Sequence, residues 1–246
     1  MIKNKTILFE DLGCRDYLEV WNYQQERFMK IVDLKLLNRK LPKTDQRPTS
    51  NHLLFVEHPH VYTLGRSGKY VHLLLSEELL GEIGATFYQV NRGGDITYHG
   101  PGQVVGYPIL DLDHFFTDMH KYLRLLEEVV IRTLSVYGLD GDRSAGETGV
   151  WLDVGKPYTR KICAIGVHAS RWVTMHGFAL NVNIDLQYFE YIIPCGIRDK
   201  AVTSLAQELH YEVSIEEVKE RLKINFQEVF GVVLLESSSK MARIFS

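Results

Sequence analysis

Two stretches of the chain repeat apolar residues at close to the helical period. In residues 15–37, "RDYLEVWNYQQERFMKIVDLKLL", apolar side chains recur from Tyr17 to Leu34 with charged residues between them. Recurrence at three- and four-residue intervals puts these side chains on one face of a helix. Residues 118–139, "DMHKYLRLLEEVVIRTLSVYGL", show the same pattern and reach Gly138, a residue type suited to the position after a helix end. We therefore predict an amphipathic helix in each stretch.

A third helix is predicted near the end of the sequence. Ser214 and Glu217 stand three residues apart, which is the spacing of a capping box. In that motif the serine hydroxyl and the glutamate carboxylate each accept a hydrogen bond from a backbone N–H that the helix leaves unpaired. Gly231 follows the apolar periodic part, so we expect the helix to end there.

Short β-rich runs separate the predicted helices. They are "HLLFVEH", "VYTLG", "TFYQVN", "QVVGYPILDL", "GVWLDV", "KICAIGVHA" and "VTMHGFALNVN". Short turns between neighbouring runs favour antiparallel pairing, and long helices of this kind pack on a face of a sheet. The pattern predicts an α+β fold, a mixed β-sheet with flanking helices, in a single domain over residues 1–246. "LPKTDQRPTS" is interpreted as a surface loop.

Charge and composition narrow the classes of partner and compartment. Against 28 Lys and Arg stand 31 Asp and Glu, for a net charge of −3, so no global basic field points to nucleic acid. The start, "MIKNKTILFEDLG", lacks the apolar run of a signal peptide, and no other stretch approaches the length of a membrane span. Three cysteines without a CxxC motif suit a reducing compartment. We expect a cytoplasmic protein that binds neither nucleic acid nor membrane.

The ten histidines do not form a recognisable metal motif. There is no HExxH, and "EHPHVY" places His58 and His60 around a proline, without cysteine or carboxylate ligands at usable spacing. We therefore expect no metal site.

"RGGDITYHGPGQ", from Arg92 to Gln103, is unusually rich in glycine. Glycine loses more backbone entropy on folding than any other residue, so a cluster needs a reason such as a tight turn or close approach of a ligand. Two interpretations stay open at this point. The stretch forms a pair of tight turns, or it lays its backbone against a substrate.

Cys195, in "YIIPCGIRDK", is the cysteine whose neighbours favour exposure. Pro194 restricts the backbone before it and Gly196 frees the backbone after it, so the thiol is expected on a turn, where a nucleophile can be presented. The alternative is a buried structural cysteine, because a free Cys packs as a small apolar residue.

Lys161, in "TRKICAIG", is a lysine at the entrance to an apolar run, and a cation near a thiol favours the reactive thiolate. By the alternation of a strand its side chain shares a face with Cys163 and Ile165. A lysine that only extends to solvent from a strand end is the alternative. Spacing alone also permits a pair of Lys161 with Cys163 in place of a pair with Cys195.

His99 and His176 are both followed by glycine at expected strand edges. Either imidazole could orient a substrate or accept a proton. A hydrogen-bonded structural role is the alternative for each. Gly177, Phe178 and Ala179 place small backbone beside an apolar wall, which suits an acyl chain.

These stretches occur in the order of a known family. "EHPHVYTLGR", "RGGDITYHGPGQVVGYPILDL", "RKICAIGV", "HGFALNVNIDL" and "IPCGI" resemble the lipoyl(octanoyl) transferases of the lipoate-protein ligase B type, over roughly residues 52–205. The resemblance implies a fold like the catalytic domain of biotin and lipoate ligases. It also implies a catalytic Cys195, as a nucleophile that forms an acyl thioester, and a catalytic Lys161 that lowers the thiol pKa and shuttles protons. The acyl pocket that it implies is formed by Arg92, Gly93, Gly94, Asp95, Ile96, Thr97, Tyr98, His99, Ala164, Ile165, Gly166, Gly177, Phe178 and Ala179.

The activity implied is transfer of an octanoyl group from octanoyl-acyl carrier protein to a lysine of lipoyl domains. The acceptors would be the lipoyl domains of 2-oxoacid dehydrogenases and the glycine cleavage H protein, with no cofactor and no ATP. Two alternatives remain. An ATP-dependent lipoate or biotin ligase would not need Cys195, and a non-catalytic binding module for acylated domains would need neither Cys195 nor Lys161.

Overall fold

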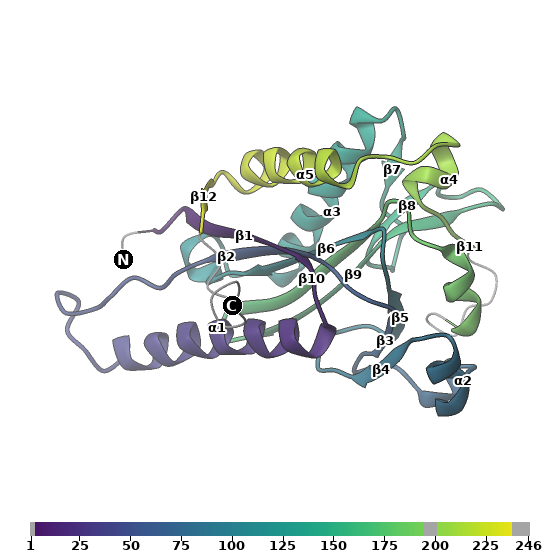
Figure 1. Ribbon diagram of the computed structural model, residues 1–246. Coiled ribbons are helices and arrows are strands. Elements are labelled where there is room, and N and C mark those ends of the chain that lie inside the picture. The colour runs from purple at the N-terminus through teal and green to yellow at the C-terminus, as the bar shows by residue number, and fades with distance from the viewer. Residues whose placement is uncertain (1–2, 194–200, 238–246) are drawn as a thin grey trace.

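A mixed β-sheet forms the centre of the computed structural model, which describes residues 3–193 and 201–237 (Figure 1). Its strands run in the order β12-β1-β2-β6-β10-β9-β8-β7, and β11 pairs with β9. The pairs β1–β2, β1–β12 and β9–β11 are parallel, and the others are antiparallel. The strands of this sheet are β1 (Thr6–Cys14), β2 (His52–Glu57), β6 (Gln103–Ile109), β7 (Gly141–Asp142), β8 (Val150–Leu152), β9 (Arg160–Ser170), β10 (Val173–Asn181), β11 (Ala201–Val202) and β12 (Val233–Glu236).

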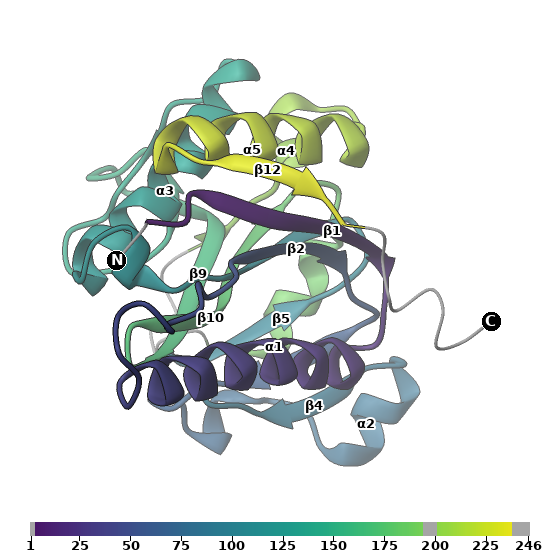
Figure 2. The ribbon, with the colours of Figure 1, turned by 90° about the vertical axis from the view of Figure 1, so that its left-hand side faces the viewer.

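Helices cover both faces of this sheet. Helix α1 lies on one face, while α3 and α5 pack against each other on the opposite face (Figures 1 and 2). The apolar stripe of each helix is buried against the strands, which removes the apolar surface of sheet and helices from water together. None of the helices described is both long and apolar enough to cross a membrane. The helices are α1 (Tyr17–Asn38), α2 (Glu77–Glu82), α3 (Met119–Val136), α4 (Leu205–Leu209) and α5 (Ile215–Phe230), with 3-10 turns η1 (Tyr70–His72), η2 (Leu112–His114) and η3 (Leu186–Tyr191).

A small second sheet lies at one end of the molecule, with α2 beside it (Figure 1). It has the order β4-β3-β5, from strands β3 (Val61–Leu64), β4 (Thr86–Gln89) and β5 (Ile96–His99). Its own apolar cluster is built around Tyr62, Leu64 and Tyr98, each at most 1% exposed. The glycine-rich stretch therefore begins in the small sheet and continues into β6 of the main sheet.

The three predicted helices are confirmed, and Ser214, Gly138 and Gly231 stand at their ends as predicted. Asp16 caps α1, where its carboxylate accepts hydrogen bonds from two backbone N–H groups. The Ser214 hydroxyl accepts from the Glu217 N–H at the start of α5, as the capping box requires. Gly138, just past α3, and Gly231, at the end of α5, both adopt positive φ angles, which glycine reaches without steric cost.

The seven β-rich runs all contain strands, but β1 and its edge partner β12, and the short strands β5, β7 and β11, were not among the predicted runs. β1 escapes a reading of apolar patterns because Glu10 and Asp11 interrupt its apolar residues. Glu10 is nevertheless buried: its carboxylate accepts hydrogen bonds from the Tyr23 hydroxyl at 2.6 Å and from Arg27 Nη2 at 2.9 Å. A tertiary ion pair thus permits a charge inside the sheet. "LPKTDQRPTS" forms a connection without helix or strand, as expected.

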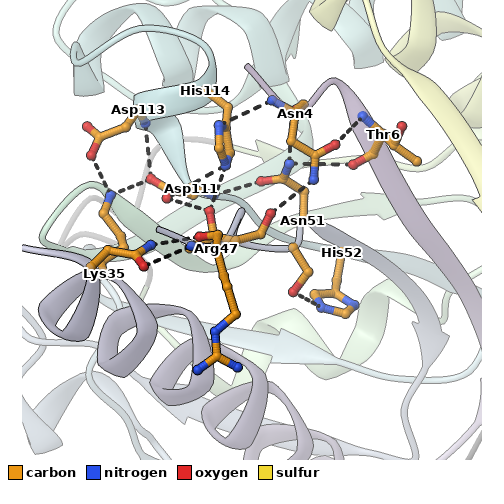
Figure 3. A network of polar contacts seen from close by, with 12 residues as sticks. Asn4, Thr6, Lys35, Arg47, Asn51, His52, Asp111, Asp113 and His114 are labelled. Carbon is orange, nitrogen blue, oxygen red and sulfur yellow. Dashed lines mark hydrogen bonds and ion pairs between the residues drawn. The ribbon is translucent and has the colours of Figure 1, made fainter. Parts of the chain in front are cut away.

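A buried polar network attaches the C-terminal part of α1 to the sheet (Figure 3). Lys35 forms ion pairs with Asp111 and with Asp113, the latter at 2.8 Å. The other Asp111 carboxylate oxygen accepts a hydrogen bond from Thr49 Oγ1 at 2.7 Å, and Thr49 Oγ1 also lies 2.6 Å from His114 Nε2. A buried carboxylate that loses its cation is costly, so this network fixes the position of α1.

We predict that Lys35→Met lowers the free energy of unfolding by about 3–5 kcal/mol, because it leaves Asp111 charged and buried without its cation. Lys30→Met on the same helix is the matched control. Lys30 pairs with Glu26 at the surface, where both side chains are more than half exposed, so its loss should cost less than about 1 kcal/mol. Urea unfolding of both variants measures the difference. Equal small losses would show that the network does not hold α1.

Candidate active site

A cavity of about 580 Å³ opens beside the glycine-rich stretch. This volume lies in the ordinary range for small-molecule sites. Strands β5, β6, β9 and β10 contribute to its wall, and so does the start of α1. The residues predicted from the sequence that line it are Arg92, Gly93, Gly94, Asp95, Ile96, Thr97, His99, Lys161, Ala164, Ile165, Gly166, Gly177, Phe178 and Ala179.

Tyr98 is the predicted pocket residue that the structure does not bring to the cavity. Side chains alternate between the two faces of a strand, and Tyr98 lies on the face of β5 opposite to that of its neighbours Thr97 and His99. Its hydroxyl bonds to His60 Nδ1 at 2.6 Å and its ring stacks on Tyr188 at 5.0 Å. We therefore assign Tyr98 to the core of the small sheet instead of the acyl pocket.

The glycine-rich loop is held between two other segments by direct backbone contact. The Gly93 N–H donates to the Val167 carbonyl of β9 at 2.9 Å. A Cβ at Gly166 would lie 2.9 Å from the Gly93 oxygen, and a Cβ at Gly65 would lie 2.4 Å from the Gly94 oxygen. Both distances are too short for a real side chain. The stretch thus forms tight turns and also presents its backbone to the cavity, while contact of this backbone with a substrate stays a prediction.

Arg92 secures the same loop from inside. It is 8% exposed, and its Nη2 donates to the Thr63 carbonyl at 2.7 Å and to Thr63 Oγ1 at 2.9 Å, while Nη1 donates to the Gly93 carbonyl at 3.1 Å. Asp95 is held at the other end of the loop, where its Oδ2 lies 2.6 Å from His72 Nδ1. Because Arg92 binds both β3 and its own loop, it fixes the wall of the cavity.

Gly177 lines the cavity, but packing already explains why it has no side chain. A Cβ there would lie 2.1 Å from the Gly106 carbonyl oxygen and 2.6 Å from Pro108 Cδ, both on the neighbouring strand β6. Gly106 in turn leaves room for the Phe178 ring, which a Cβ at Gly106 would approach to 2.3 Å. The two glycines thus let β6 and β10 approach closely beneath the cavity.

Lys161 lies in the cavity wall near the start of β9. Its Nζ sits 4.4 Å from the centre of the Trp151 ring, which is close enough for a favourable cation–π contact. Trp151 is on β8, where the pairing with β9 shifts register between Val150 and Trp151. Ile162 and Cys163 are both buried in the core, while Lys161 lines the cavity. Simple alternation would have put Lys161 and Cys163 on the same face of β9, so the alternation fails at this irregularity.

The two candidate nucleophiles are the thiols of Cys163 and Cys195. Cys163 is fully buried, and burial raises the pKa of its thiol well above the ordinary value, although nearby Lys161 acts in the opposite direction. A thiol so placed is a poor nucleophile, which disfavours the pair of Lys161 with Cys163. Cys195 lies outside the described residues.

His99 and His176 are both buried neutral imidazoles. Burial lowers the pKa of each to about 3, so neither carries charge at neutral pH. His176 has a positive φ of 59°, and its Nε2 lies 2.8 Å from Asn91 Oδ1, while its backbone N–H donates to Gln24 Oε1 of α1. These contacts support the structural alternative for His176.

Several lining residues were not predicted from the sequence. Gln103 and Asn181 both lie within quoted motifs and could have been noticed as polar residues beside apolar runs. Tyr17 gives no such signal, because only the packing of α1 brings it to the cavity, where burial raises the pKa of its hydroxyl to about 12. The remaining additions are Val105, Tyr107, Leu123, Gly146, Glu147, Thr148, Val167, Phe189 and Val202.

Among residues 3–193 and 201–237, no group of three or more His, Cys, Asp or Glu side chains is placed to hold a metal ion.

The fold and the cavity agree with the relationships of the chain. Residues 31–227 match the family described as the lipoyl protein ligase A/B catalytic domain. A structure from the lipoylation system of Thermoplasma acidophilum, a bipartite lipoate protein ligase and its E2 lipoyl domain, aligns with TM-score 0.66 and 18% identity, over 99% of this chain and 90% of that one. A lipoate-protein ligase A bound with ATP aligns with TM-score 0.66 and 16% identity, over 98% and 92%. At such identities these likenesses define the fold alone, and they confirm the predicted α+β class.

Sequence relatives are much closer. An octanoyltransferase of Christiangramia forsetii is 65% identical over 94% of this chain and 98% of its own length. Octanoyltransferases of Flavobacterium psychrophilum and Flavobacterium johnsoniae are 62% and 66% identical, over 94% and 89% of this chain and 100% and 94% of theirs. The chain therefore belongs to the lipoyl(octanoyl) transferase family, whose members are acyltransferases.

We predict that Gly65→Ala destabilises the fold by about 1–3 kcal/mol, because the new methyl group meets the Gly94 carbonyl and the surrounding backbone must move. Gly81→Ala in α2 is the control: no atom lies within 4 Å of its added Cβ, and alanine is the better helix former. The control should be as stable as the parent or more so. Denaturant midpoints compare them, and an unaffected Gly65→Ala would disprove the tight loop contact.

Proposed function

We propose that this protein transfers an octanoyl group from octanoyl-acyl carrier protein to a specific lysine of lipoyl domains, through a thioester on Cys195. The observation that carries the proposal is the convergence of Lys161, the glycine-rich loop and the β9–β10 segment on one cavity. Three relatives that are 62–66% identical carry the name octanoyltransferase. Cys195 enters through the family motif "IPCGI".

In the first step the Cys195 thiolate attacks the carbonyl carbon of the carrier-bound thioester. The carbon–sulfur bond to the carrier breaks, and the carrier thiolate leaves with a proton from the Lys161 ammonium. Because one thioester replaces another, the step needs no nucleotide to activate the acyl group. A cation at Lys161 also favours the thiolate form of a neighbouring cysteine.

In the second step the ε-amine of the acceptor lysine attacks the new thioester. The amide bond forms, the bond to Cys195 Sγ breaks, and the amine proton passes to Lys161, which returns to its ammonium form. Negative charge develops on the carbonyl oxygen in both steps, and backbone N–H groups of glycine-rich turns are suited to stabilise it.

The apolar part of the cavity accounts for an octanoyl substrate. Val105, Ile165, Phe178 and Ala179 line it beside the bare backbone of the glycine-rich loop. At about 0.8 kcal/mol per buried methylene, an octanoyl chain contributes up to about 6 kcal/mol of binding free energy. The closed packing of β6, β9 and β10 under the cavity limits the depth that a chain can reach.

The partners proposed are octanoyl-acyl carrier protein as donor, and as acceptors the lipoyl domains of 2-oxoacid dehydrogenases and the glycine cleavage H protein. A cytoplasmic location is proposed with these reactions, and three cysteines without a CxxC motif suit such a reducing compartment.

The test of this function compares two acyl donors in one assay of lipoyl-domain modification. Octanoyl-acyl carrier protein alone should support turnover, and addition of ATP should not increase the rate. Free octanoate with ATP should give no product, because no step of the mechanism activates a free acid. Strict dependence on ATP with free octanoate would assign the protein to the ligases, and binding without turnover would make it a binding module.

We predict that Lys161→Met shifts the reaction of Cys195 with iodoacetamide to higher pH by about one unit or more. Loss of a neighbouring cation removes a stabilisation of the thiolate, so the thiol pKa rises. Lys161→Arg keeps the positive charge and should restore most of the profile. The measurement uses a Cys14→Ser background, because Cys14 is exposed and would also react. An unchanged profile in Lys161→Met would separate this lysine from the thiol.

A further inference from the structure

A chain of buried hydrogen bonds runs along the polar side of the cavity. Each of its side chains is at most 8% exposed, and four of its members line the cavity itself. The links join β3, the glycine-rich loop, β6, β10 and the segment after β11. In order, its members are Arg92, Thr63, His99, Gln103, Asn181 and Thr203.

One end of the chain fixes the orientation of both amides. Asn181 Nδ2 donates to the Thr203 carbonyl at 2.9 Å, and a backbone carbonyl can only accept. Asn181 Oδ1 therefore accepts from Gln103 Nε2 at 2.8 Å, which also donates to the Tyr98 carbonyl at 3.3 Å. Gln103 Oε1 is left facing His99 Nδ1 at 2.8 Å. An amide oxygen accepts, so Nδ1 must carry the proton.

The other end is compatible with this assignment. The Arg92 guanidinium can only donate, and its Nη2 donates to Thr63 Oγ1 at 2.9 Å. The Thr63 hydroxyl then directs its own hydrogen away from Arg92. His99 Nε2 lies 3.5 Å from Thr63 Oγ1, the longest link in the chain, and with Nδ1 protonated it is free to accept from the Thr63 hydroxyl. The tautomer is thus set from the amide end of the chain.

We propose that Gln103 and Asn181 are positioning residues that hold His99 as the neutral Nδ1–H imidazole. The two side chains are direct partners across β6 and β10, so the strand pairing itself sets their contact. Neither residue needs to touch the reacting atoms for this role.

The surroundings of His99 explain why its charge state matters. Tyr17 of α1 stacks on the ring at 5.9 Å, and His58 lies 6.0 Å away. Burial is the main cause of the lowered His99 pKa, and the positive charge of Arg92 acts in the same direction. His58 and, more weakly, His176 of β10 also lower it, while the hydrogen bond to Gln103 raises it. A protonated His99 would therefore add a second positive charge beside Arg92.

Loss of the neutral form would disturb the acyl site that the proposed function requires. A protonated Nε2 would donate toward Thr63 Oγ1 and compete with Arg92, which also holds the Gly93 carbonyl in the cavity wall. At the far end of the chain, the Thr203 N–H donates to the Lys161 carbonyl at 2.9 Å. The same set of bonds thus runs from the glycine-rich loop to the strand that carries Lys161.

The direct test is long-range ¹H–¹⁵N correlation spectroscopy of the histidine rings in the unmodified protein. The His99 signals are identified by their loss in His99→Asn. We expect a protonated Nδ1 and an unprotonated Nε2 throughout pH 5 to 9 (about the range in which an ordinary histidine titrates). An Nε2–H ring, or titration of His99 within this range, would overturn the proposal. This reading needs no enzymatic activity.

Two variants of Gln103 extend the test. Gln103→Glu places a carboxylate against Nδ1–H, which favours the imidazolium and raises the His99 pKa. At pH values below the raised His99 pKa, the KM for octanoyl-acyl carrier protein should increase about tenfold. A tenfold change corresponds to roughly one pKa unit of interaction between the charged imidazole and its surroundings. It should recover as the pH rises, while kcat changes less. Gln103→Met removes the acceptor, and His99 should then show a mixture of both tautomers. A pure Nδ1–H ring in Gln103→Met would contradict the assignment.

Gln46→Glu is the control for replacement of a hydrogen-bonded amide by a carboxylate at a partly buried position. Gln46 donates to the Asn38 and Leu41 carbonyls in the loop after α1, away from the cavity, so this variant should leave the His99 signals and the KM unchanged. The two proposals can fail separately. The expected tautomer without octanoyl transfer would reject only the function, and transfer with the opposite tautomer would reject only the role of Gln103 and Asn181.

Discussion

The close approach of bare backbone around the glycine-rich loop is the constraint on which the site depends. Gly93 and Gly94 lie between Gly65 on one side and Gly166 on the other, at distances that leave no space for a Cβ. The loop belongs to the segment that joins the small sheet to the main sheet, so this contact locks the two sheets together. Arg92 reinforces this contact, because its Nη1 donates to the Gly93 carbonyl.

Burial also decides how charge is distributed in the site. His99 and His176 stay neutral because burial disfavours their charged forms, and the Cys163 thiol is suppressed for the same reason. Arg92 remains charged, with its guanidinium donors directed to Thr63 and Gly93. The reactive pair proposed here is thereby left without a competing buried nucleophile.

Local sequence patterns predicted the helices and the central strands, because caps and apolar periods are local signals, and the family motifs predicted about half of the residues that line the cavity. The parts that failed depend on tertiary contacts. Glu10 conceals β1 until its bonds to Tyr23 and Arg27 are known, and the alternation that directs Tyr98 away from the cavity requires the exact strand register. Tyr17 reaches the cavity only through the packing of α1.

The central claim is that the acyl group passes through Cys195. Intact-protein mass spectrometry after incubation with octanoyl-acyl carrier protein, without acceptor or nucleotide, tests it most directly when followed by peptide mapping. The account predicts one octanoyl group, located on Cys195, retained in Cys163→Ala and absent from Cys195→Ala. An adduct on Cys163 with Cys195 unmodified, or transfer to a lipoyl domain by Cys195→Ala at the parent rate, would contradict it.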